Sequence, residues 1–138
     1  MKMSLETREK LLNAGLLWLR VLVGLGIAHH GYGKVFGGQM EMMIPGVAKM
    51  GFPAPVFFAW AAALSEFVGG ILLVLGLGTR IAGFFLFCTM VVAFFVAHKA
   101  DPLQVKELAG AYGTAAVALM LTGPGKWSLD SRFCPTVK

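Results

Sequence analysis

The chain has 138 residues, of which 57% are hydrophobic and only 14% are charged, and its mean hydropathy is +0.75. A soluble domain of this length could not bury so much apolar surface, so the composition excludes that class and predicts an integral membrane protein. The net charge of +5 is spread along the chain rather than clustered, which argues against a surface that binds nucleic acid.

The first predicted helix covers residues 11–30, and Arg20 is the only ionisable group before its two terminal histidines. The charged segment in front of it resembles the positive start of a signal peptide. That segment also carries two glutamates, however, and the apolar run behind it is too long for a signal peptide and is followed by no A-x-A cleavage site. We therefore expect this helix to be retained.

A loop over residues 31–54 follows, and it is too long for a simple turn. Its centre intersperses methionines with polar residues, namely Met40, Met42, Met43 and Met50 with Gln39, Glu41 and Lys49. This pattern predicts an amphipathic segment that lies in the outer membrane interface. A methionine-based Cu(I) site is the alternative, because thioether sulfur suits Cu(I).

Three further apolar helices are predicted, over residues 55–77, 80–98 and 107–122. The first of them contains only Glu66 as an ionisable group, and the second is uncharged between Arg80 and His98. Each apolar run approaches the ~20 residues that cross a ~30 Å hydrocarbon core, and strand-like alternation is absent. The sequence thus predicts an all-α fold with one domain over residues 1–138, a transmembrane four-helix bundle with an amphipathic interfacial segment between the first and second helices.

The distribution of lysine and arginine predicts the orientation, because cytoplasmic loops carry an excess of both. Seven of these residues fall on one side of the predicted bundle: Lys2, Arg8, Lys10, Arg80, Lys126, Arg132 and Lys138. Four fall on the other side: Lys34, Lys49, Lys99 and Lys106. We therefore expect a multi-pass membrane protein with both termini in the cytoplasm.

The two cysteines, Cys88 in the third predicted helix and Cys134 in the C-terminal tail, are predicted to be too far apart for a disulfide within one chain and so to be free thiols. The chain has no C-x-x-C motif, which excludes the simplest kind of membrane thiol oxidoreductase.

Candidate site residues are the ionisable groups within the apolar runs, where charges are costly and usually functional.

Arg20 and Glu66 are the charges deepest in these runs. At 1.5 Å per residue, Arg20 lies roughly 14 Å from the inner end of its helix and Glu66 roughly 16 Å from the outer end of its own. In a ~30 Å core those depths nearly coincide, so we expect the two side chains to pair near the midplane. Such a pair is either an architectural bond that fixes helix register or part of a ligand-binding or proton-handling site.

A second cluster is predicted on the outer side, where His30 and His98 close their helices and Glu107 opens the last one. Both histidines lie roughly 27 to 29 Å from the inner face. At 100° per residue, His30 lies about 80° from Arg20 around the helix and His29 about 180° away. His30 is therefore the better candidate to face the interior of the bundle.

Four interpretations of this outer cluster remain open. It could hold a metal such as Fe(II) or Zn, ligate a haem through its histidines, or bind the polar head of a quinone or another small molecule and exchange its proton. Alternatively, the histidines are solvated at the interface and Glu107 complements the positive N-terminus of its helix. Metal ligation requires a convergence that three helices rarely provide, which favours a polar pocket over a metal or haem centre.

Small residues at a spacing of four predict that helix backbones approach closely, as in Gly24-x-x-x-Ala28 and Ala109-x-x-x-Gly113. Gly70 lies at the same spacing after Glu66. We therefore expect close packing on the faces that carry the candidate site residues.

Several motifs then occur together in one order. They are Arg20 in the first helix, H-G-x-G-K-x-F-G-G at residues 30–38, S-E-F-V-G-G-I-L-L-V-L-G-L-G-T-R at residues 65–80, His98, and G-P-G-K-W-S-L-D at residues 123–130. With this order and spacing over residues 16–130, the chain resembles the DoxX family of small four-helix membrane proteins of bacteria.

The resemblance implies a location in the bacterial inner membrane. The family takes its name from a subunit associated with a thiosulfate:quinone oxidoreductase, and other members accompany redox and detoxification systems. It thus implies a membrane subunit that binds a quinone or another small molecule and works with a partner protein or as a homo-oligomer, without nucleic acid. The alternative is a non-catalytic carrier of a small solute or a membrane scaffold, since a fold does not fix an activity. The candidate ligand- or proton-binding residues are Arg20, His30, Glu66, His98 and Glu107.

Overall fold

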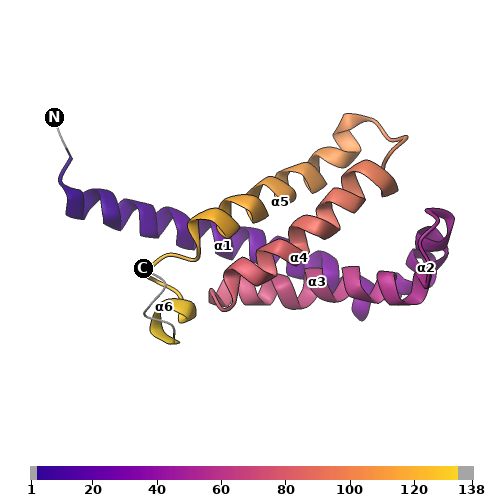
Figure 1. The fold of residues 1–138 in the computed structure, drawn as a ribbon, viewed down its shortest axis with the longest axis horizontal. Helices are drawn as coiled ribbons and strands as arrows, with labels where there is room; N and C mark the ends of the chain where they lie inside the picture. Colours follow the sequence, from indigo (N-terminus) through magenta and orange to yellow (C-terminus); the bar gives the residue numbers. More distant parts are fainter. Residues whose placement is uncertain (1–2, 134–138) are drawn as a thin grey trace.

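The computed structural model describes residues 3–133 as an all-helical bundle without a strand in that range (Figure 1). Its helices are α1 (Leu5–Val35), α2 (Met40–Lys49), α3 (Pro55–Leu75), α4 (Thr79–Val92) with its π-helical continuation η1 (Ala93–Ala97), α5 (Leu103–Thr122) and α6 (Leu129–Phe133). The predicted all-α class is thereby confirmed.

The four long helices run alternately in opposite directions. In Figure 1, α2 and the turn between η1 and α5 lie at one end of the bundle, and α6 and the turn between α3 and α4 lie at the other. We call these the α2 end and the α6 end. The helix α1 packs mainly against α3, whereas α4 packs against both α3 and α5. Polar groups at the two ends are therefore separated by the length of the bundle.

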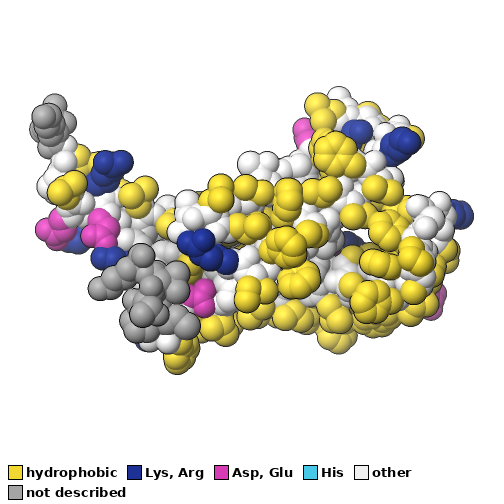
Figure 2. Space-filling view, in the orientation of Figure 1, with side chains coloured by type: hydrophobic (Ala, Val, Ile, Leu, Met, Phe, Trp, Pro, Cys, Tyr) yellow, Lys and Arg dark blue, Asp and Glu magenta, His cyan; other side chains and the backbone are white. Residues whose placement is uncertain are grey.

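Three of the helices in the described chain are long and apolar enough to cross a membrane: α1, α3, and α4 together with η1. The fourth long helix, α5, has 20 residues but carries Lys106 and Glu107 near its start. Hydrophobic side chains cover most of the bundle face in Figure 2, and charged ones lie toward its ends. This distribution is the one that a lipid bilayer requires, and it makes the chain a membrane protein.

The first helix is longer than predicted, because it begins at Leu5 rather than Leu11 and ends at Val35 rather than His30. Ser4 caps its start, where its hydroxyl accepts a hydrogen bond from the Thr7 N–H at 3.2 Å. Its C-terminal extension, Gly31–Val35, stays helical despite two glycines. The reason is that this part of α1 packs against α3.

The other predicted boundaries are close to the observed ones. The helix α3 begins at Pro55 as predicted and ends two residues early, where Gly76 takes a left-handed conformation (φ 66°) and the Leu77 N–H bonds to the Leu72 carbonyl at 3.0 Å. The last long helix begins at Leu103 rather than at Glu107, just after Pro102. The predicted amphipathic segment is the helix α2.

Small residues set the spacing between α1 and α3, as the sequence predicts. A Cβ added to Gly24 would lie 2.6 Å from the Gly70 carbonyl oxygen, and one added to Gly70 would lie 2.6 Å from the Ala28 nitrogen. Only glycine permits so close an approach. The core beside this contact consists of Ile27, Leu73, Ala82, Leu86, Ala116 and Leu119.

Candidate functional site

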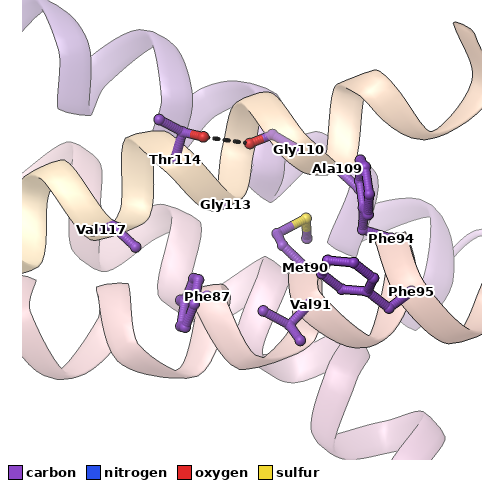
Figure 3. A pocket seen from close by; sticks show the side chains of 10 residues that line it. All are labelled: Phe87, Met90, Val91, Phe94, Phe95, Ala109, Gly110, Gly113, Thr114 and Val117. Atoms are coloured by element: carbon purple, nitrogen blue, oxygen red, sulfur yellow. Dashed lines mark hydrogen bonds between the residues drawn. The ribbon is translucent and has the colours of Figure 1, made fainter. Parts of the chain in front are cut away.

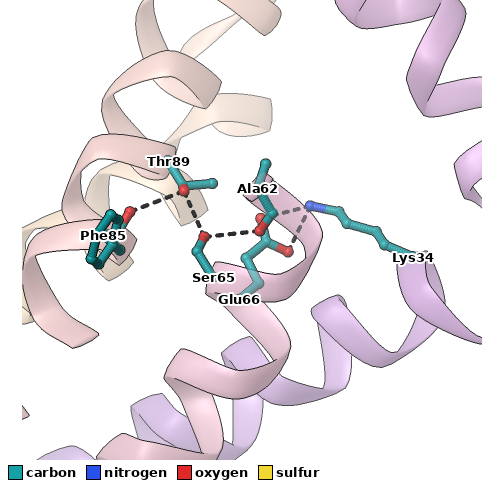
Figure 4. A network of polar contacts seen from close by, with 6 residues as sticks. All are labelled: Lys34, Ala62, Ser65, Glu66, Phe85 and Thr89. Atoms are coloured by element: carbon teal, nitrogen blue, oxygen red, sulfur yellow. Dashed lines mark hydrogen bonds and ion pairs between the residues drawn. The ribbon is translucent and has the colours of Figure 1, made fainter. Parts of the chain in front are cut away.

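A buried ion pair lies toward the α2 end of the bundle. The carboxylate of Glu66 on α3 is 3% exposed, and both of its oxygens lie 2.6 Å from the Lys34 ammonium of α1 (Figure 4). The Lys34 side chain is 25% exposed. A carboxylate buried in an apolar bundle is costly unless a cation compensates it, and Lys34 is that cation.

Gly31 brings the two partners of this pair together. A Cβ added to Gly31 would lie 2.6 Å from the Phe67 Cα and 2.8 Å from the Glu66 carbonyl carbon. The backbone of α1 therefore passes directly over the turn of α3 that carries Glu66. Lys34, one turn further along α1, can then reach the carboxylate.

A second polar contact fixes the same turn of α3 to α4. The Ser65 and Thr89 hydroxyl oxygens are 2.7 Å apart, and each is also within hydrogen-bond distance of a backbone carbonyl of its own helix (Figure 4). Glu66 is thus held between α1 on one side and α4 on the other. Such support limits the movement of a functional side chain.

A cavity of about 260 Å³ opens beside the ion pair. Its polar lining comes from four helical segments and consists of His30, Lys34, Glu66, His98 and Tyr112. Its apolar lining consists of Ile27, Met90, Ala93, Val105, Leu108 and Ala109. A mainly apolar cavity with a few convergent polar groups is the usual form of a small-molecule site.

The π-helical turn η1 positions His98 at this cavity. The His98 N–H bonds to the Ala93 carbonyl at 3.0 Å, which is the i→i+5 bond of a π-helix. The imidazole Nδ1 lies 2.7 Å from Asp101 Oδ2. Because a carboxylate only accepts hydrogen bonds, this contact places a proton on Nδ1 and leaves Nε2 for another partner.

His30 lines the same cavity, and its ring lies edge-on to the Tyr112 ring with 6.1 Å between centroids. His29 and His30 are both exposed, but only His30 is part of the lining. The sequence-based choice of His30 over His29 agrees with this lining, although the His30 side chain is not enclosed by the bundle. So does the expectation that His30 and His98 lie at one depth, although their role in binding stays a prediction.

The predicted pairing of Arg20 with Glu66 is wrong. Glu66 pairs with Lys34, and Arg20 lies at the α6 end opposite Gly76, where a Cβ would collide with its guanidinium. Gly76 follows Glu66 by ten positions along α3, or roughly 15 Å at 1.5 Å per residue. The depth estimate failed because it assumed that the start of α1 lies at the inner face of the bundle, whereas the contacts of Gly24 with Gly70 and of Gly31 with Phe67 set the register of α1 against α3.

Arg20 belongs to a cluster that joins the C-terminal segment to the bundle, and we call it the α6-end lock. Its guanidinium is 2% exposed and donates to the Trp127 carbonyl. The Asp130 carboxylate acts electrostatically on Arg20 and accepts from the N–H groups of Gly78 and Thr79 at 2.7 and 3.0 Å. A carboxylate at the start of α4 also complements the helix dipole.

Glu107 is exposed on α5 and is not among the residues that line the cavity. Within residues 3–133, no three His, Cys, Asp or Glu side chains are grouped so that they could hold a metal ion. Cys88 is a free, exposed thiol on α4, as predicted, whereas Cys134 lies outside the described residues.

Lys34 and Tyr112 are the cavity residues that sequence reasoning missed. Lys34 was counted only as a loop charge, because the first helix was expected to end at His30. Had the helix been extended to Val35, Lys34 would follow Gly31 by three positions on the buried face of α1. Tyr112 carries no comparable signal in the sequence.

Comparison with known proteins places the chain among bacterial membrane proteins, although no solved structure matches it. It is 34% identical over 131 residues to an uncharacterized membrane protein of Mycobacterium tuberculosis, covering 83% of this chain and 78% of that one. It is 34% identical over 123 residues to the Bacillus subtilis protein named "Putative oxidoreductase CatD", covering 88% and 89%. It is 33% identical over 132 residues to the Escherichia coli inner membrane protein YphA, covering 85% and 89%. The DoxX family profile matches residues 15–99, and the chain therefore belongs to the DoxX family.

Proposed function

We propose that this protein is a membrane subunit of a redox or detoxification system and that it binds a quinone or another small carbonyl-bearing molecule in the cavity at the α2 end. The observation that carries this proposal is the shared lining of that cavity by His30, His98 and the Lys34–Glu66 pair. The name of the Bacillus subtilis relative, which describes an oxidoreductase, supports a redox role.

The side chains offer the chemistry that a quinone head requires. An ammonium has three donors, so Lys34 retains the capacity to donate to a ligand carbonyl while it contacts Glu66. The contact with Asp101 leaves the His98 Nε2 free to form a hydrogen bond with a ligand and to exchange a proton with it. Reduction of a quinone takes up two electrons and two protons. We propose that these side chains exchange the protons and that a partner protein exchanges the electrons.

We further propose that the protein lies in the bacterial inner membrane with both termini in the cytoplasm. The inner membrane location of the Escherichia coli relative and the seven-to-four distribution of basic residues support this orientation. A reporter enzyme that is active only in the periplasm, fused after Lys138, should stay inactive. Activity of that fusion would refute the orientation.

The binding proposal is tested with the purified protein in nanodiscs and decylubiquinone as the probe, with the signal of empty nanodiscs subtracted. His30→Ala and Glu66→Gln should each weaken binding by about tenfold or more, since each removes a polar contact with the ligand or the support of such a contact. Equal affinity of both variants and the wild type, or no binding by the wild type, would contradict the proposal.

Two matched variants control for nonspecific effects. His29→Ala removes the neighbouring imidazole, which lies outside the lining, and Glu41→Gln removes an exposed carboxylate of α2. Both variants should bind the probe like the wild type. If a variant and its control lost affinity for the probe equally, the loss would come from a general perturbation of the bundle and not from a change in the cavity.

A further inference from the structure

An apolar groove of about 320 Å³ lies between α4, η1 and α5 (Figure 3). Its lining includes Met90, Phe94 and Phe95 from α4 and η1, and Gly110, Gly113 and Thr114 from α5. The hydroxyl of Thr114, the only polar side chain in this set, donates to the Gly110 carbonyl of its own helix at 2.8 Å. The groove thus offers a ligand almost nothing but apolar contact.

The groove adjoins the polar cavity. Met90 and Ala109 line both of them. In the π-helical turn, Ala93 lines the cavity, and the next two residues, Phe94 and Phe95, line the groove. One short segment therefore forms the border between a polar compartment and an apolar one.

Two glycines of α5 leave space for the groove, because neither has a side chain that would fill it. A Cβ at Gly110 would lie 3.2 Å from the Phe94 ring, and a Cβ at Gly113 would lie 3.3 Å from the Met90 Cβ. Any side chain at either position would intrude on the lining. The Phe95 side chain at the groove is 66% exposed, so this side of the bundle faces the surrounding bilayer.

We propose that the ligand is amphipathic, with its carbonyl-bearing head in the cavity and a single apolar chain in the groove between α4 and α5. This inference rests on the proposed function and names the class of ligand. Each compartment alone lies near the lower limit of known ligand sites, which span about 300 to 1,000 Å³, whereas the two adjoining compartments together fall within that range. The ligand enters from the bilayer, between the two helices, without crossing an aqueous phase.

The test compares two probes that share one head: 2,3-dimethoxy-5-methyl-1,4-benzoquinone, which has no chain, and its decyl derivative. Lipid tails are as apolar as the groove, so a longer chain gains affinity from packing and not from leaving water. Thr114→Phe fills the groove. We expect it to weaken binding of the decyl probe about fivefold or more and to change binding of the chainless probe by less than about twofold.

Two further variants make this comparison specific. Ala111→Phe adds the same ring at an exposed position of α5 outside the groove and should leave both probes unaffected. Phe95→Ala removes an exposed wall of the groove without filling the groove. It should weaken binding of the decyl probe and leave binding of the chainless probe unchanged. This second variant keeps the inference testable if Thr114→Phe does not fold.

The outcomes separate the inference from the proposed function. One outcome is that the wild type binds the chainless probe in a way that depends on His30, while neither groove variant changes binding of the decyl probe. In that case ordinary lipid fills the groove, so the inference is overturned while the proposed function stands. A groove variant that weakens both probes equally also overturns the inference, because the cavity itself is then disturbed. If the wild type binds neither probe above empty nanodiscs, the proposed function fails as well.

Discussion

The two ends of the bundle hold their buried charges in different ways. At the α6 end, Arg20 and Asp130 are engaged by backbone groups of the α3–α4 turn and of the C-terminal segment. At the α2 end, Lys34 and Glu66 engage each other and border an open cavity. Each end holds one almost fully buried charge, Arg20 or Glu66. Only the second leaves room for a ligand, so access and not burial separates an architectural charge from a candidate functional one.

The largest expected effect on stability comes from the α6-end lock. Asp130→Ala removes the cap of α4 (~1 kcal/mol) and the carboxylate whose charge acts on the buried Arg20, a second loss that stays below the ~3 to 5 kcal/mol of a buried ion pair because the two side chains form no salt bridge. Because Asp130 is only partly buried, we expect a total loss of about 3 kcal/mol, or a melting temperature lower by about 10 °C. Thermal unfolding in detergent measures this change.

If the α6 end has only an architectural role, Asp130→Ala should still bind decylubiquinone at temperatures where the variant is folded. Glu6→Ala is the control, since it removes an exposed carboxylate of α1 that pairs with the exposed Lys10. Its melting temperature should hardly change. If Asp130→Ala keeps its melting temperature but loses binding of the probe, the α6 end takes part in ligand binding and its assignment as purely architectural is wrong.

The next effect tests how α1 approaches α3. Gly31→Ala places a methyl group against the Phe67 backbone, and such overpacking costs about 1 to 3 kcal/mol. Gly15→Ala is the matched change on the same helix, where a Cβ meets nothing within 4 Å. It should stabilise the protein by about 0.5 to 1 kcal/mol, because alanine is the better helix former. Shifts of the same sign in both melting temperatures would show that Gly31 does not set the helix contact.

A smaller effect tests the ion pair itself. We expect Glu66→Gln and Lys34→Met to be non-additive, with a coupling free energy of about 1 to 2 kcal/mol, below the value of a fully buried pair because Lys34 is partly exposed. Unfolding of both single variants and the double variant completes the cycle. Additive losses would mean that the two side chains are neighbours without being partners.

The smallest effect concerns the hydroxyl contact behind Glu66. Ser65→Ala breaks the bond to Thr89 between α3 and α4, and such bonds in membrane bundles contribute about 0.6 kcal/mol on average. Thr122→Val is the control, since its hydroxyl bonds to the Ala118 carbonyl of its own helix. Binding of the probe should survive both changes. A strong loss of binding in Ser65→Ala alone would extend the functional site across α3.

Much of the fold follows from the sequence. Uninterrupted apolar runs reveal the long helices, and the small residues Gly24, Ala28 and Gly70 reveal where α1 meets α3. The boundaries were less predictable at Gly31 and at Pro102. Without tertiary contacts, glycine favours the end of a helix. Here α1 continues through Gly31, because α3 packs against it.

The candidate site was only partly predictable, because depth along a helix does not specify a partner. Estimated depth correctly brought His30 and His98 to one level, but it also paired Arg20 with Glu66. The true partner of Arg20 is a carbonyl 107 positions away in the chain, and nothing in the local sequence indicates it. Lys34 was missed for a related reason, since its position depends on a helix end that tertiary packing decides.

The contacts of Asp130 with Gly78 and Thr79 bear on the order in which the protein is assembled at the ribosome. The turn between α3 and α4 is synthesised about fifty residues before the carboxylate that caps it. Arg20, in the first helix, likewise obtains its Trp127 partner only after 107 further residues have been synthesised. A chain truncated before position 127 leaves a buried cation and two backbone donors without these partners. Residues 127–130 thus complete contacts of helices that are synthesised well before them, and we expect chains that lack these residues to be degraded faster.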